Sequence, residues 1–554
     1  MDSKFVYDHW CQNVKNSELL SELLNMASDD GGISDRFGSS LSFGTAGARG
    51  LIGMGTNRLN IFTVRQISYS FASFLVGKFK NPSVVISYDT RKLSDVFAKI
   101  SAGVFAFYGI KVHFFKNPQP IGLLSFAIRN LSAFGGVMIT ASHNPPEYNG
   151  YKIYDSNGAQ PTNVDEISER FRSVDPFSVE FLDFEKSLKD GKIEFVSKEL
   201  VEEYVNIFKQ KINFKGLNNL DITYSPLNGC SLDLFECLFN DVKNIHVVEE
   251  QKLRDSSFKS CNPPDPQKLN SFDLSLKLAK KHNSDLIILN DPDGDRLGIA
   301  LRYKNNYRIL SGIEVAALFL DYLGKKRRDR TSYFVVKSVV TGGLANSIVK
   351  FYGMKCIETL PGFKYIAECM DNLEKNGNID SFLMGFEESN GFLLDSNIRD
   401  KDGISSAAFF CEMVSFYKSK NTNCIDVLES LYEKFGYHMQ KNISFKESNP
   451  EKIKQSIQKF RQYFFDNRGD VVSISDYRIS EKVNFVNNEK TKICLPKSDM
   501  LGIEFEGNNI LFVRSSGTEP LIKFYILYNS VFKERAYKIC EKIESLIYKI
   551  YTSF

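Results

Sequence analysis

The sequence contains no long apolar run. None of its 554 residues lies in a stretch of about 18 apolar residues, the length that a membrane-spanning helix needs. The first residues, MDSKFVYDHW, lack the basic and then apolar layout of a secretory signal. We therefore expect a soluble, cytoplasmic protein without a membrane partner.

A disulfide pattern and a strong charge bias are also missing. The ten cysteines form no C-x-x-C pair and are spaced irregularly, which is typical of buried thiols in a reducing compartment. The formal net charge is only +3, so we expect no nucleic-acid partner. The chain is longer than one hydrophobic core can organise, and several domains are expected.

Strands and helices alternate along most of the chain. A short β-branched run at 83–87 is followed by a helical pattern at 94–108 and a further strand at 111–115. The same order recurs within 220–289 and within 314–417. This alternation predicts three consecutive α/β domains with mainly parallel sheets. Loops that carry chemistry are then expected at the carboxyl ends of the strands.

The C-terminal part of the chain follows a different pattern. Residues 503–513 resemble two strands around a turn, and 532–550 a long amphipathic helix, which predicts a smaller α+β domain. The polar stretch 441–450 is the most linker-like part of the chain. The predicted domains, arranged around a central cleft, are residues 1–200, 201–312, 313–440 and 441–554.

Three aspartates stand at alternating positions directly after an apolar strand. They are Asp291, Asp293 and Asp295 in the segment Asn290-Asp-Pro-Asp-Gly-Asp-Arg. Oxygen ligands from one tight loop suit Mg²⁺. A calcium EF-hand loop is excluded, because it needs glycine and glutamate at the positions that Arg296 and Arg302 occupy. An acidic surface turn is the alternative.

Three further segments offer groups that bind phosphate or sugar hydroxyls. Arg514-Ser-Ser-Gly-Thr-Glu-Pro combines a guanidinium, hydroxyls and a glycine, which suit phosphate oxygens, although it is not a Walker loop. Gly385-Phe-Glu-Glu-Ser-Asn-Gly offers carboxylates and a hydroxyl for the hydroxyls of a sugar. Phe43-Gly-Thr-Ala-Gly-Ala-Arg-Gly is glycine-rich and contains Arg49. Each of them could instead be an ordinary polar turn.

The segment Thr140-Ala-Ser-His-Asn-Pro-Pro follows another apolar run. Pro145 and Pro146 prevent a helix from starting at once, so Ser142 is expected in an ordered, exposed loop. His143 is adjacent, but neighbouring residues on an extended loop point apart, and the G-x-S-x-G motif is missing. Hydrolase-like activation of the serine is therefore not expected. Together with a metal loop and basic phosphate loops, the segment predicts a serine that carries a phosphoryl group.

Five motifs occur in the order found in one enzyme family. They are Phe43-Gly-Thr-x-Gly-x-Arg-Gly, Thr140-Ala-Ser-His-Asn-Pro, Asp291-x-Asp-Gly-Asp-Arg, Glu387-Glu-Ser and Arg514-x-Ser-Gly-Thr-Glu-Pro. This combination resembles the α-D-phosphohexomutases over nearly the whole chain. Leu360-Pro-Gly-Phe-Lys-Tyr and Asp400-Lys-Asp-Gly-Ile-Ser are most similar to the branch that holds the eukaryotic phosphoglucomutase-2 and phosphopentomutase proteins.

The resemblance implies a role for each motif. Ser142 is the implied phosphoserine, and its phosphate would hold Mg²⁺ together with Asp291, Asp293 and Asp295. The groups implied around the reacting oxygen are Arg49, His143 and Lys152, and Arg296 would contact the sugar or the transferring group. Lys152 and His143 are the candidates for the general acid and base, and Lys152 is preferred. The implied substrate contacts are the sugar-binding Lys337, Glu387 and Ser389 and the phosphate-binding Arg514, Ser516, Gly517, Thr518 and Lys523. Lys337 could instead be an exposed charge at the end of a strand.

The resemblance also implies an activity. A phosphoglucomutase interconverts glucose 1-phosphate and glucose 6-phosphate through a phosphoserine and a bound sugar 1,6-bisphosphate. Pentose or mannose phosphates remain alternative substrates, because Pro361, Pro264 and Asn228 depart from the family pattern. An aspartyl phosphatase that uses Asp291 or Asp293, and a non-catalytic sugar-phosphate binding protein, are the alternatives from other classes. A hinge near residue 440 is expected to close the last domain over the site, and no oligomeric state is predicted.

Overall fold

The computed structural model describes residues 2–41, 43–44, 47–326, 332–447, 450–516 and 521–552. The chain divides into two compact units. Unit 1 contains Met1–Ile309 and Gly391–Ser415, and unit 2 contains Leu310–Asn390 and Phe416–Phe554. Within the described residues, no helix is both long enough and apolar enough to cross a membrane.

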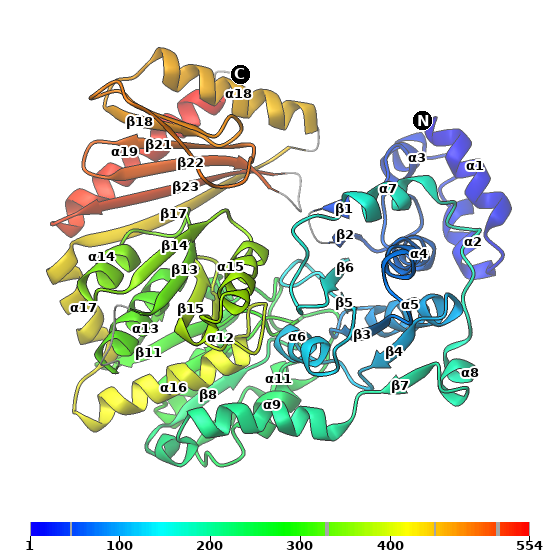
Figure 1. The fold of residues 1–554 in the computed structure, drawn as a ribbon, viewed down its shortest axis with the longest axis horizontal. Coiled ribbons are helices and arrows are strands. Elements are labelled where there is room, and N and C mark those ends of the chain that lie inside the picture. The colour runs from blue at the N-terminus through cyan, green and yellow to red at the C-terminus, as the bar shows by residue number, and fades with distance from the viewer. Residues whose placement is uncertain are drawn as a thin grey trace. The chain divides into compact units, whose positions relative to one another are not determined.

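The first sheet of unit 1 is mixed and has the strand order β1-β2-β6-β5-β3-β4-β7. Its strands are β1 (Phe43–Gly44), β2 (Gly47–Leu51), β3 (Ser83–Tyr88), β4 (Lys111–Phe114), β5 (Gly135–Ile139), β6 (Tyr148–Asp155) and β7 (Ile193–Phe195). The main helices with it are α4 (Ile61–Lys78), α5 (Ser94–Phe107) and α6 (Ile121–Asn130). Val84, Val85 and Ile86 of β3 are fully buried, as expected of a parallel strand covered on both faces. Figure 1 shows α5 and α6 beside this central part of the sheet.

The second sheet of unit 1 has the order β12-β11-β10-β8-β9. Its strands are β8 (Ile222–Ser225), β9 (Ile245–Val247), β10 (Leu286–Leu289), β11 (Gly298–Tyr303) and β12 (Asn306–Leu310), and its main helices are α9 (Lys198–Lys211), α10 (Leu232–Leu238) and α12 (Asp273–His282). β10 is parallel to β8 and antiparallel to β11. Because Leu289 pairs with Gly298, the aspartate motif is the tight connection between two neighbouring strands.

Unit 2 begins with a parallel arrangement of β14 (Lys355–Thr359), β13 (Phe334–Ser338) and β15 (Phe382–Glu387). Their helices are α13 (Gly312–Lys326), α14 (Leu344–Phe351), α15 (Phe363–Lys375) and α17 (Cys424–Phe435). The C-terminal sheet follows, with the order β17-β23-β22-β21-β18-β19-β20. Its strands are β17 (Tyr437–Lys446), β18 (Val471–Asp476), β19 (Glu481–Asn484), β20 (Lys490–Lys492), β21 (Met500–Phe505), β22 (Asn509–Ser515) and β23 (Leu521–Ser530), and its helices are α18 (Pro450–Asp466) and α19 (Lys533–Thr552).

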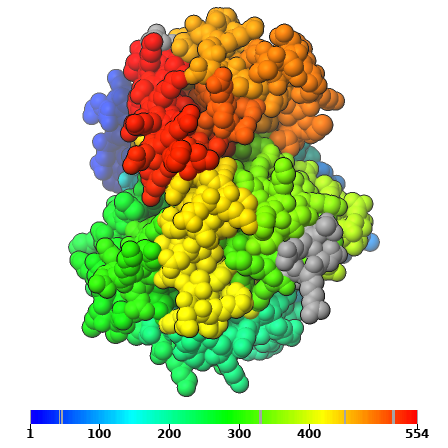
Figure 2. Space-filling model, turned by 90° about the vertical axis from the view of Figure 1, so that its left-hand side faces the viewer, coloured from blue at the N-terminus to red at the C-terminus, as the bar shows by residue number. Residues whose placement is uncertain are grey.

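The predicted fold class is confirmed. Three sheets with parallel central strands and flanking helices precede an antiparallel C-terminal sheet. The predicted hairpin corresponds to β21 and β22, and the predicted final helix to α19. Figure 2 shows the red surface of α19 packed against the orange surface of the preceding strands. The four domain boundaries and the hinge stay predictions.

The linker expected at 441–450 is wrong. Residues 441–446 belong to β17, which pairs with β23 over its whole length. β17 is an edge strand of the C-terminal sheet, so its polar side chains alternate with apolar ones such as Ile443, which is buried. Polar composition alone does not distinguish such an edge strand from a linker.

Candidate active site

Ser142 lies just beyond the carboxyl end of β5. Its Oγ donates to Asp291 Oδ2 at 2.9 Å and lies 3.2 Å from His143 Nδ1. Ser142 is only 1% exposed, so the expectation of an exposed serine is wrong. The expectation that Ser142 and His143 point apart is also wrong, because Ser142 adopts a left-handed φ of 53° that turns the chain back on itself.

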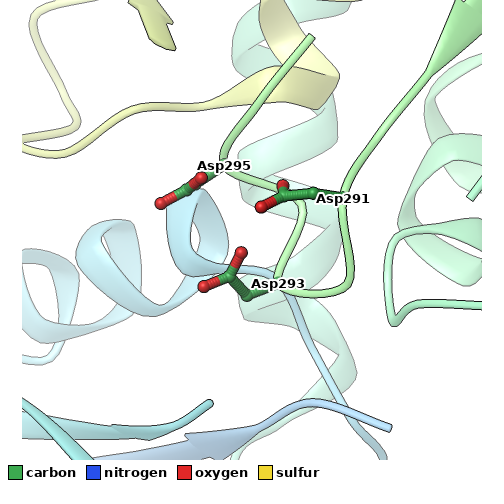
Figure 3. Close-up of side chains that lie close together, drawn as sticks. All are labelled: Asp291, Asp293 and Asp295. Carbon is green, nitrogen blue, oxygen red and sulfur yellow. The ribbon is translucent and has the colours of Figure 1, made fainter. Parts of the chain in front are cut away.

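The three aspartates converge from the loop between β10 and β11 (Figure 3). Ligand atoms of Asp291, Asp293 and Asp295 all lie within 4.8 Å of one another. Gly294 has a φ of 67°, a conformation that glycine adopts without strain, and it allows the tight turn between them. All three aspartates are buried. The alternative of an acidic surface turn is therefore wrong.

The aspartate cluster fits a divalent cation. Asp293 Oδ1 and Asp295 Oδ1 are buried and accept no hydrogen bond from the described residues. Burial, followed by the charge of Asp293, raises the pKa of Asp291 well above its usual value. Such a cluster of buried carboxylates is stabilised by a hard cation with oxygen ligands, and Mg²⁺ is the ion that these three side chains would hold.

Lys152 from β6 provides part of the missing positive charge. Its Nζ lies 2.8 Å from Asp293 Oδ2 and 3.5 Å from Asp295 Oδ2. Burial alone would raise the pKa of Asp293, but the ammonium of Lys152 lowers it overall. Thr140 Oγ1 also donates to Asp293 Oδ2, at 3.2 Å. Lys152 therefore links the serine segment to the aspartate loop.

Two predicted arginines lie at the edge of this cluster. Arg49 donates to Asn144 Oδ1 in the serine loop at 3.2 Å. The Arg296 Nε lies 4.0 Å from Asp291 Oδ2 and 3.9 Å from an oxygen of Asp295. The structure thus brings Ser142, His143, Lys152, Arg49 and Arg296 together around the three aspartates within unit 1. Their catalytic roles stay predictions.

Three charged residues in the same unit, Lys401, Asp400 and Arg91, carried no predicted role. Lys401 Nζ lies 3.3 Å from Asp295 Oδ2 and 3.0 Å from Asp400 Oδ1, and Tyr154 donates to Asp400 at 3.0 Å. Arg91, after β3, donates to the backbone of the serine loop. In the sequence, these residues could have been noticed as short charged segments after buried strands, such as Tyr88-Asp-Thr-Arg. Only the fold brings them to the site.

The predicted sugar loop lies in unit 2, at the carboxyl end of β15. Glu387 Oε1 accepts a hydrogen bond from the backbone N–H of Gly362 at 2.8 Å, and Ser389 is half-buried in the following turn. Glu388 Oε2 accepts from Thr341 Oγ1 at 3.2 Å. Burial, followed by the charge of Glu387, raises the pKa of Glu388 to about 7. The loop is therefore held by its neighbours rather than freely solvated.

Lys337 stands at the end of β13 and is 1% exposed. Its Nζ pairs with Glu358 at 2.8 Å and donates to the Thr341 carbonyl at 3.0 Å. The alternative of an exposed strand-end charge is wrong. A contact between Lys337 and a sugar stays a prediction, because this structure shows the ammonium engaged by protein groups.

The predicted phosphate loop follows β22. Arg514 pairs in register with Lys523 of β23, and Ser516 comes directly after the strand. Gly517 and Thr518 lie outside the described residues. The Arg514 charge opposes the raised pKa of Glu388, so the guanidinium is within electrostatic reach of the sugar loop in the same unit.

Comparison with known proteins covers most of the chain. The models for phosphoglucomutase/phosphomannomutase alpha/beta/alpha domains I, II and III match residues 40–176, 202–304 and 311–435. A phosphoglucomutase of Staphylococcus saprophyticus is 33% identical, with 93% of this chain and 95% of that protein covered. A phosphoglucomutase of Staphylococcus aureus is 32% identical, with 93% and 94% covered.

Solved structures resemble the fold at lower identity. A putative phosphomannomutase of Thermus thermophilus has a TM-score of 0.68 at 21% identity, with 92% of this chain and 99% of that chain covered. The Paramecium phosphoglucomutase parafusin has a TM-score of 0.68 at 17% identity, with 92% and 96% covered. At these identities the likeness concerns the fold alone.

Proposed function

Because the chain belongs to the phosphoglucomutase/phosphomannomutase family, we propose that it interconverts glucose 1-phosphate and glucose 6-phosphate. The observation that carries the proposal is the 2.9 Å contact between Ser142 Oγ and Asp291 in a cluster of three buried aspartates. A hydroxyl held against a cation site is suited to carry a phosphoryl group, whose charge needs neutralisation. The reaction takes place in the cytoplasm, on small-molecule sugar phosphates.

In the first half of the reaction, phosphorylated Ser142 transfers its phosphoryl group to the free hydroxyl of the sugar monophosphate. The bond between Ser142 Oγ and phosphorus breaks and a bond from the sugar oxygen to phosphorus forms. The sugar hydroxyl gives its proton to a base, and Ser142 Oγ takes up a proton. The product is a sugar 1,6-bisphosphate. It turns end over end in the site, and its other phosphoryl group is transferred to Ser142. The bond from that phosphorus to the sugar oxygen breaks, a bond to Ser142 Oγ forms, and the serine proton passes through the base to the sugar oxygen.

Cationic groups neutralise charge during this transfer. Bound Mg²⁺ would supply Lewis-acid stabilisation of the transferring phosphoryl group. Lys152 and Arg49 add positive charge on the side of the serine loop, and Arg296 adds it beside the aspartates. These side chains are held by hydrogen bonds and ion pairs before substrate binds, so little reorganisation is needed during the reaction.

We assign the proton transfer to His143 in preference to Lys152. His143 Nδ1 lies 3.2 Å from Ser142 Oγ, so it can give a proton to the serine oxygen when the phosphoryl group leaves and take it back when a phosphoryl group is transferred to Ser142. The Lys152 ammonium is engaged by two carboxylates. His143→Gln should lower kcat about 100-fold or more. An unchanged rate in that variant would return the role to Lys152.

The other predicted residues bind the part of the substrate that does not react. Glu387, Ser389 and Lys337 would bind the sugar, and Arg514, Ser516, Gly517, Thr518 and Lys523 the second phosphate. The charge-assisted bonds between a guanidinium and a phosphate are strong and directional. The phosphate-binding residues from Arg514 to Lys523 would thus form one distal clamp, which serves both orientations of the bisphosphate.

The proposal is tested by peptide mapping after incubation with glucose 1,6-bisphosphate and Mg²⁺. We expect phosphate on Ser142, and an inactive Ser142→Ala variant in an assay of glucose 6-phosphate formation. An aspartyl phosphatase would keep its activity in Ser142→Ala, and a non-catalytic binding protein would carry no phosphate. Rates on glucose, mannose, ribose and deoxyribose 1-phosphates at equal Mg²⁺ identify the preferred sugar. Either an active Ser142→Ala variant or an unphosphorylated Ser142 would overturn the proposal.

A further inference from the structure

The turn after β3 carries a buried arginine directed at the serine loop. Arg91 is 3% exposed. Its NH1 donates to the carbonyl oxygens of Pro145 and Tyr148, at 2.9 and 3.0 Å. Its NH2 donates to the carbonyl oxygens of Ser142 and Asn144, at 2.5 and 2.6 Å. One guanidinium therefore binds four backbone carbonyls of the serine loop.

Arg91 is itself held in a fixed position. Its Nε lies 3.3 Å from Asp89 Oδ2, and both side chains are fully buried. Asp89 Oδ1 accepts from the Arg91 N–H at 2.9 Å and from Ser94 Oγ at 2.7 Å. The Arg91 guanidinium also lies 5.0 Å from the centre of the Phe258 ring. A planar group fixed on two sides can impose a shape on the loop that it binds.

The same turn contacts the sheet that carries the aspartates. Thr90 Oγ1 donates to the Asn228 carbonyl at 2.7 Å. Two residues further on, the Cys230 N–H donates to the Pro292 carbonyl at 3.0 Å, and a Cβ on Gly229 would lie 2.6 Å from Pro292 Cα. The turn therefore binds the serine loop on one side and, through Asn228–Cys230, reaches the aspartate loop on the other.

We propose that the turn Asp89–Arg91 sets the position of Ser142 Oγ against Asp291, with Arg91 as the positioning residue. Ser142 has a left-handed φ, which a non-glycine residue keeps only when its surroundings enforce it. The four carbonyl contacts of Arg91 provide that enforcement. This inference rests on the proposed function, in which Ser142 must present its oxygen in line with the substrate hydroxyl.

The decisive variant is Arg91→Lys, which keeps the charge but loses the planar fork of donors. We expect the transfer of a phosphoryl group from glucose 1,6-bisphosphate to Ser142 to slow by about 100-fold, the effect of a misplacement of about 1 Å. Hydrolysis of phosphorylated Ser142 by water should rise relative to transfer. The Mg²⁺ affinity should stay within about threefold of wild type, because the aspartates themselves are unchanged.

Arg58→Lys is the matched control. Arg58 is also a buried arginine of unit 1 with an aspartate partner, Asp35, but its side-chain hydrogen bonds within the described part of the chain go to Asn57 and Asp35, away from the serine loop. A purely structural role for Arg91 predicts that both variants lose thermal stability and keep the wild-type ratio of transfer to hydrolysis. That result, at a temperature well below both midpoints, would overturn the proposal.

Hydrogen exchange separates this inference from the proposed function. Arg91→Lys should raise the exchange rate of backbone amides in residues 142–148, whether or not Ser142 is phosphorylated. If the wild-type protein never carries phosphate on Ser142 but exchange rises in the variant, the function fails and the positioning of the loop stands. If exchange and transfer in Arg91→Lys both match wild type, the positioning role fails and the function stands.

Discussion

Lys152 Nζ lies 2.8 Å from Asp293 Oδ2, although the two residues are 141 positions apart in the sequence. Lys152 belongs to β6 of the first sheet, and Asp293 to the loop after β10 of the second. The contact brings a cation to a cluster of buried carboxylates at the point where Ser142 also donates to Asp291. Two loops from different sheets therefore share one electrostatic centre.

Lys152→Met should lower kcat by about 100-fold to 1,000-fold, the loss typical of removing one preorganised charge donor from a reaction centre. KM for the sugar phosphate should change little, because Lys152 forms ion pairs with the aspartates rather than binding the substrate. Lys111→Met is the control, since Lys111 lies on β4 of the same sheet and pairs with the half-exposed Glu194. Steady-state assays of both variants measure the effect. Equal activity in the two would show that the Lys152 charge has no part in the reaction.

Asp291→Asn tests the metal cluster. Burial raises the pKa of Asp291 above its value in an unfolded chain, so without metal the folded protein loses stability as the pH rises through the folded pKa. The Asp291→Asn variant lacks that titration, and its metal-free melting temperature at neutral pH should equal or exceed that of wild type. The rise in melting temperature on adding Mg²⁺ should disappear. A variant that Mg²⁺ stabilises as strongly as wild type would contradict Asp291 as a ligand.

The strands and the chemical motifs of this chain could be predicted because their signals are local. Leu286–Leu289 is a short run of apolar residues, and the residues directly after it carry the aspartates. A buried parallel strand and a loop at its carboxyl end follow from that pattern alone. The succession of three α/β domains and the final hairpin could be predicted from local patterns in the same way.

The contacts that complete the site could not be predicted, because they join residues far apart in the sequence or depend on an unusual backbone conformation. Lys401 meets Asp295 only after the chain has passed through unit 2 and returned to unit 1. The contact between Ser142 and His143 depends on a left-handed φ that nothing in the local residue types demands. Arg91 is part of a short polar turn in the sequence, and its four carbonyl partners appear only in the fold.

Glu388→Gln should remove a pH dependence of stability from unit 2. The pKa of Glu388 is raised to about 7, first by burial and then by Glu387. Its stabilising contribution is therefore complete below the unfolded pKa and is lost as the pH rises through about 7. Between about pH 5 and about pH 8, the variant should gain about 2 kcal/mol relative to wild type. This gain is smaller than the full shift implies, because Glu388 is not completely buried.

Denaturant unfolding of both proteins across this pH range measures the effect. Glu374→Gln provides the comparison, since Glu374 lies on the exposed side of α15 in the same unit. A constant difference between Glu388→Gln and wild type from acid to alkaline pH would show that Glu388 does not titrate in this range.

Arg514→Ala tests the distal clamp. If Arg514 binds the phosphate that is not transferred, its loss should weaken substrate and transition state together, and kcat/KM should fall about 100-fold through KM more than through kcat. Arg514→Lys should be more active than Arg514→Ala, because the positive charge remains. It should stay below wild type, because an ammonium lacks the bidentate geometry of a guanidinium. Lys482→Ala is the control, since Lys482 lies in the same sheet and pairs with Glu504 at 3.0 Å. A loss confined to kcat would instead place the Arg514 charge beside the transferring group, because an interaction made only in the transition state lowers kcat and leaves KM unchanged.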